Sequence, residues 1–190
     1  MTGRAKLAAR IGVYGTIMLV ALAWFATPNY LGDPVSPEAG AIALLRGYLG
    51  AQWKFRKQDR YGRRVLVYAN TVCGTGFPDL FRLGGPMPEG EAADGADLKL
   101  IDLAFARATS PAKARYGYWF VDIVGDAVSG KHYDYTKECG LCAVPAVYGK
   151  TGINTYVIDL CGTVYAKDTH GTPVRVFPDV ANEGWKRLDW

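Results

Sequence analysis

The sequence predicts an α+β protein with a single transmembrane helix at its N-terminus. An apolar run without charged residues, 11–26, follows a basic N-terminus. Apolar residues then recur at helical spacing after Ser36, and the chain from Tyr116 onward is rich in β-branched and aromatic residues. With 49% apolar and 21% charged residues, the chain has the composition of a folded domain, which excludes a largely disordered protein.

The net charge of +4 gives little information about partners, because three basic residues lie within the first ten. The remaining basic and acidic residues almost balance. A nucleic-acid-binding domain needs a basic surface, and only the stretch 54–64 approaches one. We therefore expect no nucleic-acid partner. This stretch reads as a solvated helix end, with a contact to lipid headgroups or an acidic partner as the alternative.

The apolar run 11–26 can be a cleaved secretory signal or a retained anchor. Cleavage at the small residues 21–23 would leave only about ten apolar residues before the cut and would place Trp24 at the new terminus. As a helix the run is about 24 Å long, slightly less than a hydrocarbon core of about 30 Å. We favour the anchor, with aromatic rings at the far interface. Its characteristic residues are Ile11, Leu19, Trp24 and Phe25.

Lysine and arginine before the apolar run are expected to hold the N-terminus in the cytoplasm. The predicted organisation is a cytoplasmic segment 1–10, a transmembrane anchor 11–30 and an extracytoplasmic domain 31–190. This arrangement places the protein in the inner (cytoplasmic) membrane, with the main domain in the periplasm. Its expected partners are membrane lipid and other membrane protein subunits.

The predicted domain begins with a helix at Ser36-Pro37-Glu38. Serine is a good N-cap, proline is tolerated at the first helical position, and glutamate interacts favourably with the helix dipole. The apolar period carries this helix to near Asp59. The other predicted elements are a β-like run at 65–68, an irregular stretch at 73–97, helical spacing at 98–108, a β run at 116–124, a hairpin of 142–148 and 153–160 with a four-residue loop, and further sheet at 163–166.

The four cysteines are expected to form two disulfides, because the domain is predicted to lie outside the cytoplasm. They are Cys73, Cys139, Cys142 and Cys161. Four cysteines allow three pairings. If the hairpin pairs Tyr148 with Ile153, Gly140 faces Cys161. Either Cys139 or Cys142 could then bond to Cys161, and Cys73 would take the other.

Cys139 and Cys142 also have the Cys-x-x-Cys spacing of a thiol oxidoreductase. In such enzymes the first cysteine lies at a helix N-terminus, whereas here the motif leads into a predicted strand that contains Pro145. Haem attachment would need a histidine at position 143, which is Ala143. A zinc site with four cysteines would need a second closely spaced pair, which the chain lacks.

No other motif points to chemistry. His132 and His170 fall in no recognisable motif, and the chain has neither a P-loop nor a Gly-x-Ser-x-Gly elbow. We therefore expect no enzymatic activity, no catalytic residue, no cofactor and no metal. Aromatic residues could instead supply a stacking surface for a ligand, although core packing is their usual role. These residues are Trp119, Tyr133 and Tyr135.

Several stretches of the C-terminal half follow one another in an order that is more specific than any single stretch. They are YGYWF at 116–120, AVPAVYGKTG at 143–152, NTYVID at 154–159, GTVYAKD at 162–168, and FPD at 177–179 with Trp185, together with the looser stretch 59–69. In this order they resemble an uncharacterised family of exported bacterial proteins with a pilin-like build. The resemblance implies a helix packed on a small antiparallel sheet, and it carries no activity. Pilins have a glutamate early in the apolar helix, which 11–26 lacks, so an ordinary pilus is not expected.

The predicted fold class is therefore a transmembrane helix followed by a pilin-like helix on a small antiparallel sheet, stapled by disulfides. The leading functional hypothesis is a non-catalytic structural or accessory subunit of a larger membrane assembly, with a respiratory or photosynthetic complex as a possible host. One alternative is a periplasmic thiol–disulfide protein that uses Cys139 and Cys142. The other is a minor pilin-like surface or ligand-binding protein.

Overall fold

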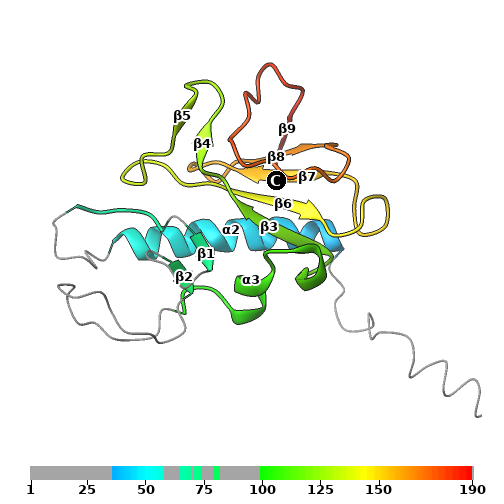
Figure 1. The fold of residues 1–190 in the computed structure, drawn as a ribbon, viewed down its shortest axis with the longest axis horizontal. Helices are drawn as coiled ribbons and strands as arrows, with labels where there is room; N and C mark the ends of the chain where they lie inside the picture. The colour runs from blue at the N-terminus through cyan, green and yellow to red at the C-terminus, as the bar shows by residue number, and fades with distance from the viewer. Residues whose placement is uncertain (1–35, 58–64, 70, 74–78, 82–98, 190) are drawn as a thin grey trace, which may run out of the picture. The chain divides into compact units, whose positions relative to one another are not determined.

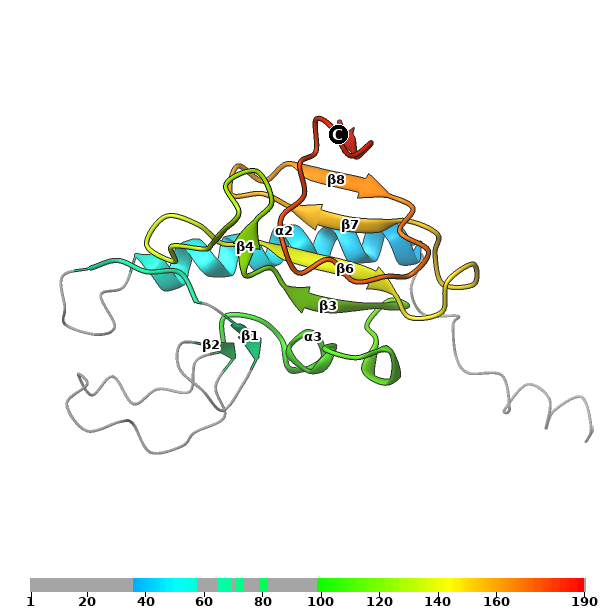
Figure 2. The same cartoon turned by 45° about the horizontal axis from the view of Figure 1, so that its top comes forward.

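In the computed structural model, one long helix lies against a mostly antiparallel sheet (Figures 1 and 2). The structure describes residues 36–57, 65–69, 71–73, 79–81 and 99–189. Its elements are α2 (Pro37–Arg56), β1 (Thr71–Cys73), β2 (Asp79–Phe81), α3 (Leu103–Arg107), a 3₁₀ turn η1 (Pro111–Lys113), β3 (Tyr118–Asp122), β4 (Gly125–Asp126), β5 (Lys131–His132), β6 (Leu141–Pro145), β7 (Thr155–Ile158), β8 (Val164–Lys167) and β9 (Lys186–Leu188).

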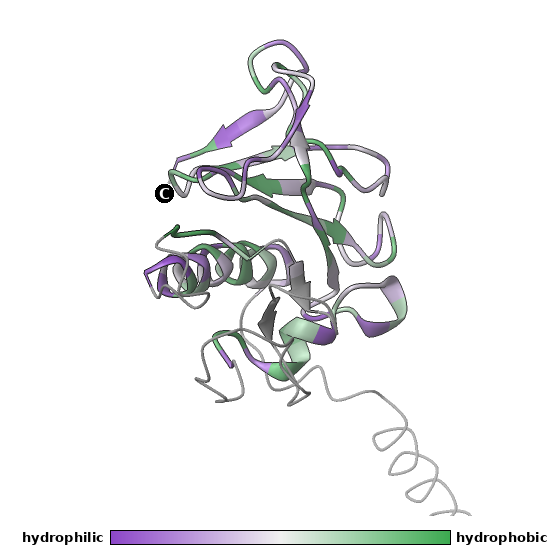
Figure 3. Ribbon diagram, turned by 60° about the vertical axis from the view of Figure 1, so that its left-hand side comes forward, coloured by the Kyte–Doolittle hydropathy of each residue, from purple (hydrophilic) through white to green (hydrophobic). Residues whose placement is uncertain are grey.

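The main sheet has five antiparallel strands in the order β3-β6-β7-β8-β9. Each strand pairs with its neighbour along the chain, except that the hairpin of β4 and β5 is inserted between β3 and β6. A separate pair, β1 and β2, is parallel. Figure 3 shows α2 along one face of the main sheet, whose central strands are largely apolar.

The two faces of the sheet bury two different apolar clusters, because successive side chains of a strand point to opposite faces. The face toward α2 buries side chains that include Tyr118, Phe120, Leu141, Tyr156 and Ile158. The opposite face buries Val121, Cys142, Val144, Val157 and Trp185, with Phe177 and Val180 of the long connection between β8 and β9 packed on them.

Helix α2 begins where the sequence predicts. The Ser36 hydroxyl accepts a hydrogen bond from the Ala39 amide at 3.2 Å, and Pro37 occupies the first turn. The helix ends at Arg56, and residue 59, the predicted end, lies outside the described residues. The stretch 65–69 is described without a regular strand, and the predicted helical stretch 98–108 contains only the five-residue α3.

A two-residue turn before β3 presses an aromatic ring against α2. Arg115 and Tyr118 pair across this turn, and the residues between them, Tyr116 and Gly117, have φ values of 49° and 74°. Positive φ at both central positions is the geometry of a type I′ hairpin. A Cβ added at Gly40 of α2 would meet the Tyr116 Cγ at 2.7 Å and its Cβ at 2.8 Å. Glycine at position 40 therefore makes room for the Tyr116 side chain.

We predict that Gly40→Ala lowers the free energy of unfolding by about 1–3 kcal/mol, since the new methyl group overpacks this contact. The matched control is Gly47→Ala in the same helix, where the structure places no heavy atom within 4 Å of an added Cβ. That change should raise the free energy of unfolding by about 0.5–1 kcal/mol, through better helix propensity. Urea titration of both variants measures the difference. Equal stabilisation by both changes would show that Tyr116 does not constrain position 40.

The fully buried amide of Gln52 connects α2 to the following segment and to the sheet. Its Nε2 donates to the Ala69 carbonyl at 2.8 Å, and its Oε1 accepts from the Ala69 amide at 2.8 Å. Nε2 also donates to the Tyr48 hydroxyl at 2.8 Å, which in turn donates to the Gly140 carbonyl just before β6, at 3.2 Å. Every polar atom of this buried group thus has a partner, as burial requires.

We predict that Gln52→Leu lowers the free energy of unfolding by about 3 kcal/mol, because it leaves the buried Ala69 amide and carbonyl without partners. Thr155→Val is the comparison, because the buried Thr155 hydroxyl has a single side-chain partner among the described residues, the Thr169 hydroxyl at 2.7 Å. Its expected cost is about 1 kcal/mol. Hydrogen exchange at the Ala69 amide should accelerate in the Gln52 variant alone. If both variants lose the same free energy of unfolding and the Ala69 amide stays protected from exchange, the Gln52 amide is not what holds the backbone of Ala69.

The hairpin of β6 and β7 exists, but its register differs from the prediction. The predicted register would pair Leu141 with Leu160, whereas the structure pairs Leu141 with Ile158. The connection runs from 146 to 154 and contains a compact turn, in which the Thr151 amide donates to the Val147 carbonyl at 2.9 Å. This turn takes up residues that the prediction assigned to the strands.

The predicted membrane-anchored fold class and inner-membrane location are contradicted. None of the helices among the described residues is both long and apolar enough to cross a membrane. Helix α2 has 20 residues, yet it carries Glu38, Arg46, Lys54 and Arg56 and is amphipathic. The predicted anchor 11–30, with Ile11, Leu19, Trp24 and Phe25, and the predicted segment 1–10 lie outside the described residues.

Candidate functional site

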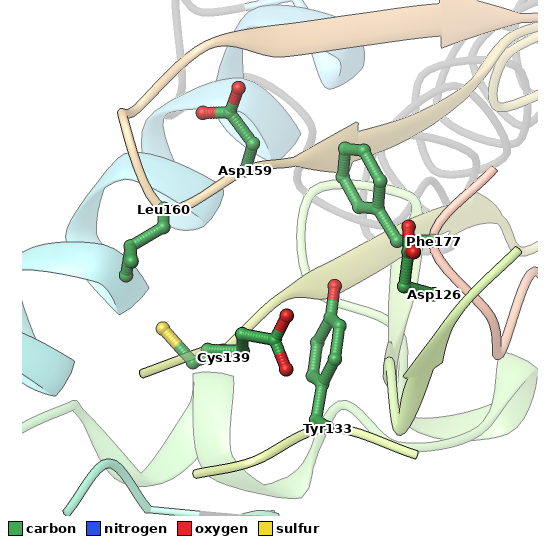
Figure 4. Close-up of a pocket in the computed structure, with 7 residues that line it drawn as sticks. Asp126, Tyr133, Cys139, Asp159, Leu160 and Phe177 are labelled. Carbon is green, nitrogen blue, oxygen red and sulfur yellow. The ribbon is translucent and has the colours of Figure 1, made fainter. Parts of the chain in front are cut away.

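An open pocket of about 180 Å³ lies at the end of the main sheet where β6 begins and β7 ends (Figure 4). Four segments far apart in the sequence contribute to it: β4, the loop before β6, the turn after β7 and the connection before β9. The lining residues are Asp126, Tyr133, Glu138, Cys139, Asp159, Leu160 and Phe177.

One wall of the pocket is built by β4 and the segment that pairs with it. The Phe177 amide donates to the Gly125 carbonyl at 2.7 Å, and the Ala127 amide donates to the Phe177 carbonyl at 2.9 Å. These bonds place Asp126 and Phe177 side by side as a parallel bridge pair. One carboxylate and one aromatic ring are thereby fixed at the same wall.

The loop before β6 supplies Tyr133 and Glu138. The Tyr133 amide donates to the Val124 carbonyl at 2.9 Å, which ties the loop to the end of β3. The Glu138 carboxylate accepts from the Asp134 amide at 3.0 Å, and the Asp134 carboxylate accepts from the Thr136 hydroxyl at 2.6 Å and from its amide at 3.0 Å. These bonds to Thr136 lower the pKa of Asp134 to about 2. The loop is thus held by its own acidic side chains.

The third wall is the turn that follows β7. The Asp159 carboxylate accepts from the Thr163 amide at 2.8 Å and from the Tyr165 hydroxyl at 3.4 Å. Gly162, with φ of 85°, allows the chain to reverse here. These two hydrogen bonds fix the orientation of the Asp159 carboxylate, which Figure 4 shows on the side of the turn away from Tyr133.

The pocket is acidic, since three of the seven described residues that line it are carboxylates and none of these seven is basic. The hydrogen bond from the Ser129 backbone amide, and after it the bond from the Ser129 side chain, lower the pKa of Asp126, so this carboxylate is ionised at neutral pH. In Figure 4 the Tyr133 ring points into the space between the carboxylates. Burial raises the pKa of Tyr133, and the charges of Glu138 and Asp126 raise it further, so the phenol keeps its proton.

The cysteines do not form the predicted disulfides among the described residues. Cys139, Cys142 and Cys161 are free thiols, and the side chain of Cys73 lies outside the description. The positions of two of the thiols explain part of this result: Cys139, which precedes β6, packs into the cluster beneath α2, whereas Cys142 of β6 packs on the opposite face of the sheet. In the observed register Cys142 faces Val157, and Cys161 is exposed within the turn that follows β7.

Neither cysteine of the Cys-x-x-Cys motif has the environment of a reactive thiol. Burial raises the pKa of both Cys139 and Cys142 to about 12. A thiolate is stabilised at a helix N-terminus or beside a cation, and this motif instead leads into β6. The geometry therefore gives the thiol–disulfide hypothesis no support.

We predict that iodoacetamide at pH 8 alkylates Cys161 of the folded protein much faster than Cys139 or Cys142. With a pKa of about 12, roughly one in ten thousand of these buried thiols is a thiolate at this pH. Peptide mass spectrometry assigns the label to each cysteine, and the unfolded protein in urea is the control in which all four react. Rapid labelling of Cys139 or Cys142 in the folded protein would restore the redox hypothesis.

The other residues singled out from the sequence lie in varied places. His132 is exposed in β5, and His170 is exposed in a turn, where its ring stacks on Tyr148 at a centroid distance of 5.6 Å. Trp119 packs against the apolar cluster on the sheet face opposite α2. Tyr135 lies beside Tyr133, with the ring centroids 6.4 Å apart. In the part of the chain that the structure describes, no group of three or more His, Cys, Asp or Glu side chains could hold a metal.

Of the aromatic residues proposed from the sequence, Tyr133 lines the pocket. The three carboxylates that line the same pocket were not predicted from the sequence. Asp126, Glu138 and Asp159 are separated by more than ten residues each and form no motif. Only the folding of three turns onto one end of the sheet brings them together. No local signal in the sequence marks this set.

Comparison with known proteins agrees with the predicted likeness to an uncharacterised family. A family described as "Protein of unknown function (DUF2950)" matches residues 36–180, which is more than half of the chain. Neither the curated proteins nor the solved structures contain a match. The matched range starts at the N-cap of α2 and extends beyond Phe177 of the pocket. The chain therefore belongs to the DUF2950 family.

Proposed function

We propose that the described unit is a non-catalytic binding module that accepts a basic side chain of a partner protein in its acidic pocket. The observation that carries this proposal is that three of the seven residues lining one open pocket, Asp126, Glu138 and Asp159, are carboxylates, and that none of the described lining residues is basic. Carboxylates placed in this way attract a cation, and a partner side chain that brings its own charge relieves their mutual repulsion.

The size and walls of the pocket favour a single side chain. A volume of about 180 Å³ corresponds to about six water molecules, which a lysine or arginine side chain could displace. Tyr133 and Phe177 supply aromatic surface, which attracts the charged end of such a side chain. Leu160 offers apolar surface for its methylene groups.

This proposal retains the accessory role expected from the sequence and unites it with the ligand-binding alternative, since Tyr133 was a candidate stacking residue. It does not include a membrane anchor. The buried thiols leave the redox alternative without a geometric basis. Export and a pilin-like build, the finer parts of the family resemblance, stay predictions.

The test is calorimetric titration of the full chain with a short peptide that contains one lysine, compared with the same peptide carrying norleucine. We expect binding of the lysine peptide alone, and its loss in the double variant Asp126→Asn/Asp159→Asn. Asparagine can still accept the hydrogen bonds from Ser129 and Thr163, so the fold should persist. A loss of about tenfold or more in affinity is expected for removal of two facing charges.

The matched control is Glu183→Gln/Asp189→Asn, which removes two carboxylates that do not line the pocket. It changes the net charge by the same amount and should leave peptide affinity within about twofold. Equal losses in both double variants would mean that the peptide responds to net charge alone. That result, or equal binding of the norleucine peptide, would contradict the proposed role of the pocket.

A further inference from the structure

Helix α2 has a solvent-facing side whose composition the fold does not explain. Its exposed residues from the middle of the helix to its end, which we call the basic face, are Arg46, Gly47, Gly50, Trp53, Lys54 and Lys57. The opposite side of the helix carries the apolar residues that pack beneath the sheet. The basic face is therefore the part of α2 that remains open to a partner.

The two glycines of the basic face have no role in the described structure. Glycine inside a helix costs about 0.5–1 kcal/mol relative to alanine. Gly40 is explained by the ring of Tyr116, but no heavy atom of the described structure lies within 4 Å of a Cβ added at Gly47 or Gly50. Glycine is the residue that permits another chain to approach a helix backbone closely. The unexplained glycines indicate such an approach by a chain segment that is not among the described residues.

An exposed tryptophan lies beside these glycines. Trp53 is 51% exposed, although tryptophan is usually largely buried. Tryptophan is also the residue most often found as an energetic anchor of protein interfaces. The open helix surface at the two glycines, with a large exposed aromatic ring next to it, is suited to contact with a polypeptide segment.

The charge of the face identifies the chemistry of this partner. Arg46, Lys54 and Lys57 are exposed there, and the face carries no acidic residue. Arg56, by contrast, is turned away: its Nη2 donates to the Thr136 carbonyl at 3.1 Å and its guanidinium lies over the Tyr68 ring. Like charges along one face repel each other unless an anion lies between them.

We propose that the basic face of α2 is the docking surface for an acidic segment of a partner protein. The segment lies over Gly47 and Gly50, covers Trp53, and places carboxylates near Arg46, Lys54 and Lys57. A nucleic acid fits less well, because three cations are few compared with the 6–10 phosphate contacts typical of nucleic-acid binders. This surface is independent of the acidic pocket, which lies at the end of the sheet and has the opposite charge.

The experiment measures the binding of fluorescein-labelled poly-L-glutamate to the full chain by fluorescence anisotropy at low salt. The double variant Lys54→Glu/Lys57→Glu should weaken binding about tenfold or more, since both charges are reversed. Its control is Lys113→Glu/Lys150→Glu, which reverses two exposed lysines elsewhere and changes the net charge equally. The control should weaken binding by less than about threefold.

A second variant, Gly47→Gln/Gly50→Gln, tests close approach without changing charge. Both side chains point to open space and glutamine is a good helix former, so the melting temperature should stay equal or rise. Poly-L-glutamate affinity should nevertheless fall. Unchanged affinity in this variant, equal losses in the two lysine variants, or equally tight binding of a single-stranded DNA oligonucleotide would overturn the proposal of an acidic protein partner.

Discussion

Helix α2 buries its apolar side against the five-stranded sheet, and the Gln52 amide completes this contact. Without that amide the backbone of Ala69 would be buried with no partner for its polar atoms. The same network reaches Gly140 through the Tyr48 hydroxyl, so it fixes the point at which β6 enters the sheet. The position of β6 then determines where the turns at the end of the sheet can lie.

The acidic pocket is a consequence of this arrangement. Cys139, next to Gly140, lies in the pocket wall and also packs into the cluster beneath α2. Three turns with internal hydrogen bonds hold Glu138, Asp126 and Asp159 around the open space. Each of the three carboxylates accepts a hydrogen bond from a backbone amide of its own turn or loop, and these bonds fix its orientation. The basic face of α2 belongs to the same unit, so two charged surfaces of opposite sign are presented by one fold.

The sequence and the structure disagree most over the cysteines and the membrane. The spacing of Cys139 and Cys142 is compatible with a disulfide motif, yet Cys139, just before β6, and Cys142, within β6, pack into different apolar clusters. The predicted pairing also depended on a hairpin register that a compact turn at 147–151 displaces by two residues. An apolar run in the sequence suggested a membrane anchor, whereas the helix that organises the described chain is amphipathic.

Local signals in the sequence determined the start of α2, the presence of β3, and the strands of the β6–β7 hairpin. Capping and side-chain periodicity act over a few residues and can be recognised without a structure. The register of the hairpin, the need for glycine at position 40, the partners of Gln52 and the grouping of three carboxylates were decided by the tertiary structure alone. Each of these depends on contacts between segments distant in the chain, and such contacts leave no periodic pattern in the residues that make them.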